Sequence, residues 1–320
     1  MKNLKNIIIL ISIVTLSCGE METVIDLEIP AHDPVLVLNG RLDTDTNIRV
    51  LISKSVGAFD TISPSMVNDA NVLLFENNQF IDTLSLDLFN TIYPYIYDGN
   101  WDTYGSIEMN YYTSSYMPIK DKTYTIEVNH PNYTSISGTT YIPEDVIMNN
   151  ISIDSTSNND KINFQFSFDD NINQDNFYSL SLKVSCSKEI YGGDTYDYGG
   201  RVEMFSNDPS FPTQGDEILA GYTFSGEKAI FTDALFNGQQ KNISIDVFPE
   251  DFRYNDCDTI KFIFSTFSDD SYKYYNSLSD HRNNGGLDIF GGEVVPVYTN
   301  INNGLGILIS KNAQEVYIKP

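Results

Sequence analysis

Most of the chain alternates between apolar and polar residues over short runs. In "KTYTIEVNH", Tyr124, Ile126 and Val128 would share one face of a strand, and the apolar positions of "INFQFSFDD" at 162–170 repeat in the same way. Alternation with a period of two is typical of strands that bury one face. Asn, Asp, Ser and Thr separate the runs, which is typical of turns. The pattern therefore predicts a mostly β protein of short antiparallel strands.

One segment departs from this alternation. In "SDDSYKYYNSLSDHRNN", Tyr272, Tyr275 and Leu278 would share one face of a helix. A serine and two aspartates precede them, and two glycines follow, as is typical of the start and the end of a helix. We expect one short helix at about 269–283, near the C-terminus of an otherwise β chain.

The length and the turn-rich joins predict two domains. The chain has 320 residues, more than most single domains contain. A polar, turn-rich stretch follows Pro143. We therefore expect an N-terminal β-sandwich of the immunoglobulin or transthyretin type at 34–143 and a C-terminal β domain at 150–320, both antiparallel and sandwich-like.

The apolar run "GLGILI" carries two glycines, Gly304 and Gly306. Glycine weakens a strand and often marks a bulge or a close neighbouring backbone. We expect a bulge or such a close approach here, packed against the helix that carries Tyr272.

Residues 1–17 have the pattern of an export signal, because two lysines precede an apolar run that is too short to span a bilayer as a helix. The alternative is a buried N-terminal strand or helix. The quartet "TLSC" resembles the lipobox of bacterial lipoproteins, with Thr15 in place of the usual leucine. This resemblance implies that Cys18 carries a lipid anchor and that residues 18–33 form an acidic tether behind it. Several acyl chains on one residue give stable anchoring.

The net charge limits the partners of the protein. The chain has 19 basic and 44 acidic residues, a formal charge of −25, which becomes −27 without residues 1–17, since these hold Lys2 and Lys5 and no acid. Such a surface repels nucleic-acid phosphates and anionic lipid headgroups. We expect no nucleic-acid partner, and membrane contact through the lipid alone.

Motifs of known chemistry are scarce. The sequence has no His-x-x-x-His, Cys-x-x-Cys or Gly-x-Ser-x-Gly. Asp98, Asn100 and Asp102 alternate as in the first half of a calcium loop, but Thr103 and Met109 stand where that loop requires a glycine and a bidentate acid. A β-turn with solvated acids is favoured over a Ca²⁺ site, and we expect no cofactor.

An aromatic stretch, "LFNTIYPYIYDGNWDTYGSIEMNYYTSSYM", resembles an insertion between two strands. Long loops often carry function, and aromatic rings with polar atoms suit a glycan, a peptide or a protein partner. The alternative is that these rings pack within an extra hairpin. The candidate ligand or partner residues are Tyr93, Tyr95, Tyr97, Trp101, Tyr104, Tyr111 and Tyr112.

Two further cysteines, Cys186 and Cys257, remain once Cys18 is assigned to the lipid. In an exported protein they could form a disulfide, and the alternative is two buried thiols.

Two segments carry a family resemblance. The stretch "CGEMETVIDLEIPAHDPVLVLNG" and the stretch "VVPVYTNINNGLGILIS" resemble a family of Bacteroidota lipoproteins defined as a domain of unknown function. Gly19, inserted before Glu20, and Leu308-Ile309, in place of Phe-Gly-Gly, depart from the family's pattern. The resemblance implies an outer-membrane lipoprotein, often encoded beside a TonB-dependent transporter, and supplies no catalytic residues.

Together these features predict a non-enzymatic lipoprotein anchored in the outer membrane, at the cell surface or on the periplasmic face. We expect it to serve a TonB-dependent barrel as an accessory or substrate-capture subunit. A structural or adhesive surface protein is the first alternative, and a hydrolase with an unrecognised site is the second.

Overall fold

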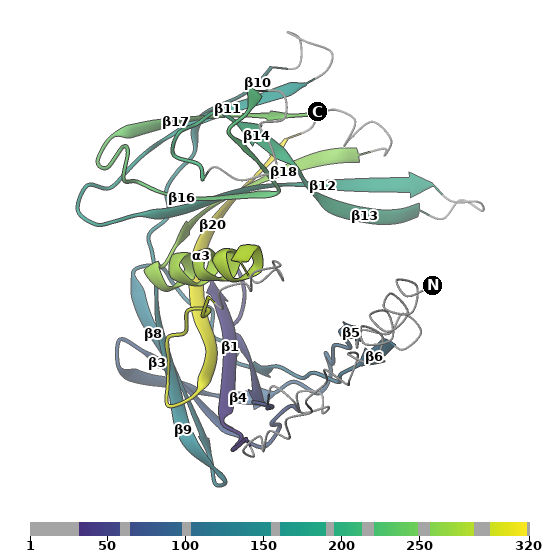
Figure 1. Cartoon of the computed structure of the whole chain (residues 1–320), viewed down its shortest axis with the longest axis vertical. Helices are drawn as coiled ribbons and strands as arrows, with labels where there is room; N and C mark the ends of the chain where they lie inside the picture. The colour runs from purple at the N-terminus through teal and green to yellow at the C-terminus, as the bar shows by residue number, and fades with distance from the viewer. Residues whose placement is uncertain are drawn as a thin grey trace, which may run out of the picture. The chain divides into compact units, whose positions relative to one another are not determined.

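A computed structural model describes residues 32–57, 65–97, 104–154, 161–189, 195–212, 221–248, 257–284 and 295–318 (Figure 1). Pro34–Pro320 forms one compact unit, which is described here. Strands dominate it, so the predicted mostly β fold is confirmed. No helix in the described ranges is long and apolar enough to cross a membrane.

A large sheet runs through this unit. Its thirteen strands, counted over the described residues, follow the order β13-β12-β18-β20-β1-β2-β7-β4-β3-β8-β9-β19, and β16 also pairs with β12. Its strands are β1 (Leu36–Asp43), β2 (Arg49–Lys54), β3 (Asn71–Glu76), β4 (Gln79–Leu86), β7 (Tyr112–Thr113), β8 (Lys122–His130), β9 (Tyr133–Ile142), β12 (Phe177–Glu189), β13 (Thr195–Val202), β16 (Lys228–Thr232), β18 (Cys257–Phe267), β19 (Ile301–Asn302) and β20 (Leu305–Ile318).

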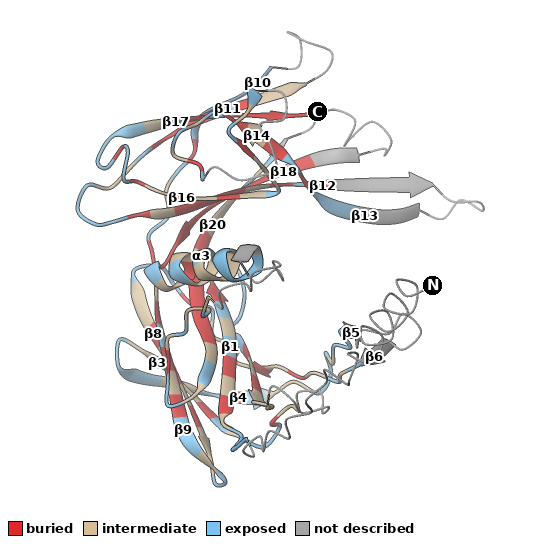
Figure 2. Ribbon diagram, in the orientation of Figure 1, coloured by how far each residue is buried: buried red, intermediate tan, exposed pale blue. Residues whose placement is uncertain are grey.

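A second sheet packs on the C-terminal part of the first. Its strands are β10 (Asn149–Asp154), β11 (Ile162–Asp169), β17 (Gln240–Val247), β14 (Met204–Ser206) and β15 (Phe224–Gly226). The rings of Phe164 and Phe166 on β11 reach those of Phe262 and Phe264 on β18, with centroids 4.9 and 5.3 Å apart. Figure 1 shows the two layers, and Figure 2 shows buried positions along the facing strands. The predicted sandwich is therefore present in this part.

The N-terminal part has a core of its own. Tyr124, Ile126 and Val128 on β8 are fully buried, as their alternation predicts. The hairpin between β3 and β4 turns at Asn77 and Asn78, whose positive φ angles of 47° and 66° suit asparagine.

The last strand belongs to both parts. β20 pairs in parallel with β1 through residues 305–311 and antiparallel with β18 through residues 311–318. The predicted division of the chain near residue 143 therefore separates the two cores but not the large sheet, because β20 contributes Leu308 to the N-terminal core and Val316 to the edge of the C-terminal one.

The predicted helix is confirmed as α3 (Asp269–Asn284). Ser268 caps it, because its Oγ accepts a hydrogen bond from the Ser271 backbone N–H at 3.1 Å. The Ser271 hydroxyl in turn donates to the Ser310 carbonyl at 2.6 Å and accepts from the Ser310 N–H at 3.0 Å. The start of α3 thus occupies the edge of β20 at the point where β18 ends.

The close backbone approach predicted at the two glycines is confirmed. Gly306 has a φ of +103°, and a Cβ there would lie 2.1 Å from the Leu38 carbonyl oxygen. A Cβ at Gly304 would lie 2.7 Å from the Leu36 oxygen. The register between β1 and β20 is continuous, so the feature is no bulge. The neighbour is β1 rather than the helix, which reaches β20 further along, at Ser310.

Candidate functional site

A cavity of about 960 Å³ lies on the outer face of the large sheet, the face turned away from the C-terminal core. Its floor follows from the alternation of β12. Tyr178 and Leu180 point into the core, whereas Ser179, Ser181 and Lys183 line the cavity. The polar half of an ordinary strand pattern therefore provides a polar cavity floor.

Helix α3 supplies an aromatic wall. Tyr272 stacks on Phe177 with ring centroids 4.7 Å apart, and Tyr275 stacks on Phe267 at 5.5 Å. Tyr272, Tyr275 and Leu278, the helix face expected from the sequence, all line the cavity and are half-buried. This face does not complete a core. It leaves ring surface available to a ligand.

Basic side chains concentrate here. Six of the 19 lysines and arginines of the chain line this cavity, compared with four of its 44 acidic residues. Five strands and the helix contribute them. The six basic residues are Arg41, Lys183, Arg201, Lys228, Arg282 and Lys311.

Only part of this charge is neutralised. Lys311 pairs with Asp43 at 2.8 Å, and Arg201 approaches Glu227 at 3.9 Å on the surface. Glu315, a cavity acid, pairs with Lys261 at 2.5 Å and so is engaged elsewhere. Within the described residues, Arg41, Lys183 and Lys228 have no carboxylate within ion-pair distance.

Lys228 has the most unusual environment of the six. Its ammonium lies 3.8 Å from the ring centroid of Tyr275 and 4.8 Å from that of Phe267. Burial in the cavity, followed by the charges of Arg201, Lys311 and Arg41, lowers the pKa of Lys228 to about 7. The two rings offset part of the cost of this desolvated charge.

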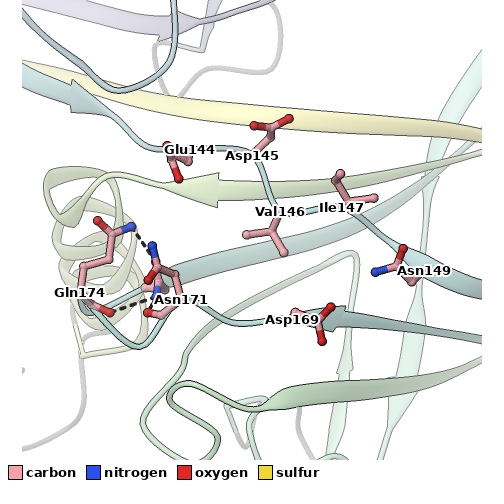
Figure 3. A pocket seen from close by; sticks show the side chains of 9 residues that line it. Glu144, Asp145, Val146, Ile147, Asn149, Asp169, Asn171 and Gln174 are labelled. Carbon is pink, nitrogen blue, oxygen red and sulfur yellow. Dashed lines mark hydrogen bonds between the residues drawn. The ribbon is translucent and has the colours of Figure 1, made fainter.

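A second, smaller cavity of about 280 Å³ lies between the segment after β9 and the end of β11 (Figure 3). Glu144, Asp145 and Asp169 line it together with amide side chains. Asp145 binds the Lys120 ammonium, which lowers the pKa of Asp145. The Gln174 and Asn176 amides hydrogen-bond each other at 3.0 Å. Several of its polar groups thus already have partners within the protein, which makes it the weaker candidate.

The predicted aromatic loop is only partly described. Tyr93 is 60% exposed, and Phe89, four residues before it in the sequence, is 98% exposed. Tyr111 is half-buried, with the Arg49 guanidinium 5.0 Å from its ring centroid. The backbones of Tyr95, Tyr97 and Tyr104 lie in the hairpin of β5 (Tyr95–Tyr97) and β6 (Tyr104–Ser106), an element that the alternative hypothesis expected.

Tyr112 corrects the prediction. It is 2% exposed within the N-terminal core, where its hydroxyl donates to the Val67 carbonyl at 3.0 Å and accepts from the Ala70 N–H at 2.9 Å. A ring held in this way cannot contact a ligand. Tyr112 begins the two-residue strand β7, where it pairs with Val50 on β2 and Leu86 on β4, and the side chain on this face of the sheet points into the core.

Several predicted residues lie outside the described ranges: Cys18, Trp101 and the weak calcium candidates Asp98, Asn100 and Asp102. Among the residues described, no group of three or more His, Cys, Asp or Glu side chains is arranged to hold a metal ion.

The backbones of Cys186 and Cys257 are brought together. They are directly opposite each other in the antiparallel register of β12 and β18, next to an irregularity after Ser185. Opposite residues in such ladders have Cα atoms about 4.5–5.5 Å apart, which lies within the range that a disulfide can bridge.

Sequence reasoning missed the basic cavity. Its six basic residues form no motif that is local in the sequence. The available signal was weak: Ser179, Ser181 and Lys183 occupy the polar positions of a strand, which normally indicates a solvent-facing surface. The pairing of strands far apart in the chain, rather than any local motif, gathers the charges.

Comparison with known families gives a match. The model of the family described as Domain of unknown function (DUF4249) matches residues 22–315. A search of curated proteins finds no match.

Proposed function

We propose that this chain, a member of the family described as Domain of unknown function (DUF4249), is a lipid-anchored outer-membrane protein that captures a small ligand for a TonB-dependent transporter. It binds this ligand without chemical turnover. The observation that carries the proposal is the cavity of about 960 Å³ beside α3, because cavities of roughly 300–1,000 Å³ are typical of small-molecule sites.

The location that we propose, the outer membrane, rests on the sequence. The short apolar leader and Cys18 support export and lipidation, and the resemblance to Bacteroidota lipoproteins supports the outer membrane and the transporter. A tether at 18–33 would leave the β unit that starts at Pro34 free to approach a barrel.

The test is purification of the native complex. A C-terminally tagged protein, extracted from its own membranes in mild detergent, is expected to bring an outer-membrane barrel with it. A Cys18→Ala variant, which cannot receive the lipid, is the matched control and should be found in the aqueous fraction without the barrel. Repeated isolation of the lipidated protein without any barrel, even after chemical cross-linking in cells, would contradict the proposal.

One observation favours a second function, adhesion. Leu88, Phe89 and Tyr93 are 66%, 98% and 60% exposed within one connection, between β4 and β5, and exposed apolar residues that gather in one place mark interaction surfaces. For an adhesive protein, Leu88→Ser with Phe89→Ser should reduce cell attachment and leave nutrient uptake unchanged. For a capture subunit, the same variant should leave attachment unchanged.

A further inference from the structure

Positive and negative charges are distributed unevenly over this protein. The chain has a formal charge of −25, yet the cavity beside α3 has six basic and four acidic lining residues. Of these acids, Asp43 is paired with Lys311, and Glu315 with Lys261 outside the lining. The cavity is therefore a local positive region within a strongly acidic molecule, and its low-dielectric walls focus that field on anything that enters.

The positive charges in the cavity repel one another, and this repulsion costs free energy when no anion is bound. Lys228 is half-buried without a carboxylate partner among the described residues, and Arg201, Lys311 and Arg41 all disfavour its charge. Buried charges in proteins are normally paired. The partner missing from the protein can be supplied by an anionic ligand, which would offset the repulsion of all these groups at once.

The other walls indicate what the anion is attached to. Tyr272 and Tyr275 present ring surface from α3, and Ile230 and Ile263 extend the apolar contact across the sheet. Serine hydroxyls lie between them on β12. An inorganic ion would leave most of this surface uncovered. A body with apolar or ring character, which is bound through its anionic group at Lys228, would fill it.

We propose that the cavity beside α3 binds an organic anion, a small molecule whose carboxylate or phosphate group pairs with Lys228 and Lys183 while its body packs on Tyr272 and Tyr275. This inference rests on the proposed function and names the ligand class of its cavity. The remaining cavity acids, Asp45 and Asp280, suit hydroxyl groups of the ligand and disfavour a molecule that is anionic at every end.

The test uses two dyes with the same aromatic body. The anion 8-anilinonaphthalene-1-sulfonate and its neutral analogue N-phenyl-1-naphthylamine are titrated into the purified full-length protein, and fluorescence is recorded. We expect one saturable site that binds the anion at least about tenfold more tightly than the neutral dye, because only the anion pairs with Lys228. Equal affinity for the two dyes would overturn the proposal.

Variants locate the site. Lys228→Met and, separately, Lys183→Gln should each weaken binding of the anionic dye by about tenfold or more. Lys183 is exposed, so its variant tests the site even if the Lys228 variant is disturbed. Lys273→Met is the matched control, since it removes the same charge from α3 outside the cavity lining, and it should bind normally. Unchanged binding in both cavity variants would overturn the proposal.

Competition distinguishes the two anionic groups. Displacement of the dye by phenyl phosphate and not by benzoate assigns a phosphate ligand, and the reverse assigns a carboxylate. Displacement by neither would contradict the proposal. These measurements are independent of the transporter: dye binding without a co-purified barrel would leave this inference standing and contradict the capture role, and the opposite pair of results would do the reverse.

Discussion

The two cores of this protein are filled in different ways. Among the described residues, ten of the 21 buried residues in the C-terminal core are aromatic, compared with two of the 18 in the N-terminal core. In the C-terminal part, rings bridge two separate sheets, which pack about 10 Å apart. In the N-terminal part, mainly Leu, Ile and Val fill the core of a single sheet, whose strand β9 contacts β1 and β20 and pairs with β19. The spacing between layers decides which residues can fill it.

The extent of the two cores also explains where the cavity lies. The aromatic core uses one face of β12 and β18, and the aliphatic core ends where β1 meets β20. Helix α3 lies against β20 and β18 next to this junction and forms one wall of the cavity. The cavity thus occupies a region that neither core needs for its stability, where polar and charged residues are tolerated.

The largest expected effect is at the junction of the two cores. Gly306→Val would place a Cβ 2.1 Å from the Leu38 carbonyl oxygen at a φ of +103°, so β1 and β20 could not pair. We expect a loss of more than about 4 kcal/mol in the free energy of unfolding, measured by urea denaturation. Gly200→Val is the control, because no atom lies within 4 Å of its Cβ position. A loss below 1 kcal/mol, as in the control, would contradict the role of the close approach.

Removing a ring tests the aromatic core. The Phe264 ring contacts those of Phe166, Phe168 and Tyr178 at centroid distances of 5.3, 4.9 and 5.6 Å. Phe264→Ala should lower the free energy of unfolding by about 3–5 kcal/mol, since it leaves a cavity and removes ring contacts. Phe80→Ala, at a ring that is 57% exposed, should lower it by less than about 1 kcal/mol. Similar losses in both variants would show that the rings do not define this core.

The cysteines sharpen the comparison, since only the C-terminal part has them in the β unit. We predict a Cys186–Cys257 disulfide in protein kept under oxidising conditions, with a mass about 2 Da below that of the dithiol. Its reduction should lower the free energy of unfolding by about 2–4 kcal/mol. A Cys186→Ser, Cys257→Ser double variant should be insensitive to the reductant. Complete alkylation of both thiols in the denatured, unreduced protein would exclude the disulfide.

Lys228 lies outside both cores, and its buried charge should lower the free energy of unfolding. Folded Lys228 loses its proton above a pKa of about 7, whereas an unfolded lysine keeps it up to about 10.4. The unfolded state then binds more protons between these values, so the free energy of unfolding should rise from pH 7 to pH 10. Lys228→Met should remove this slope and raise stability near pH 7 by about 1–3 kcal/mol. A thermal melt of Lys228→Met that is lower than that of the original chain would contradict this expectation.

The smallest effect is the pH dependence of anion binding. An anion favours protonated Lys228, so affinity for the anionic dye should be constant below about pH 7, fall above it and level off about tenfold lower, as in Lys228→Met. Lys228→Met should give a flat pH profile. This result would show that the pH dependence comes from Lys228 and not from the other charged and titratable groups facing the cavity. These are Arg41, Asp43 and Asp45 on or after β1, Lys183 on β12, Arg201 on β13, Tyr272, Tyr275, Asp280 and Arg282 on α3, and Lys311 and Glu315 on β20.

Local patterns were enough to predict the elements but not their assembly. Alternation at Tyr124, Ile126 and Val128 predicted a strand with one buried face, and the spacing of Tyr272 and Tyr275 predicted α3. Both signals depend on residues that lie within a few positions of one another in the sequence. The role of β20 in two sheet pairings depends on partners more than 260 residues away at β1, and no local periodicity records such a contact.

The candidate site was hidden for the same reason. Its basic residues run from Arg41 to Lys311, and each alone is typical of a solvated strand or helix surface. The aromatic stretch drew attention because its residues are adjacent in sequence. Tyr112 illustrates the limit of that signal, since composition cannot tell a buried ring from an exposed one.

The double pairing of β20 has a consequence for how the protein is made. β1 emerges early during synthesis, but the strand that covers its open edge arrives nearly 270 residues later. Until then β1 has an unpaired edge, which is prone to pair with other chains. Contacts of such long sequence separation form slowly. The β unit therefore reaches its native form only after almost the whole chain has been made, and the edge of β1 has to be protected from other chains during that interval.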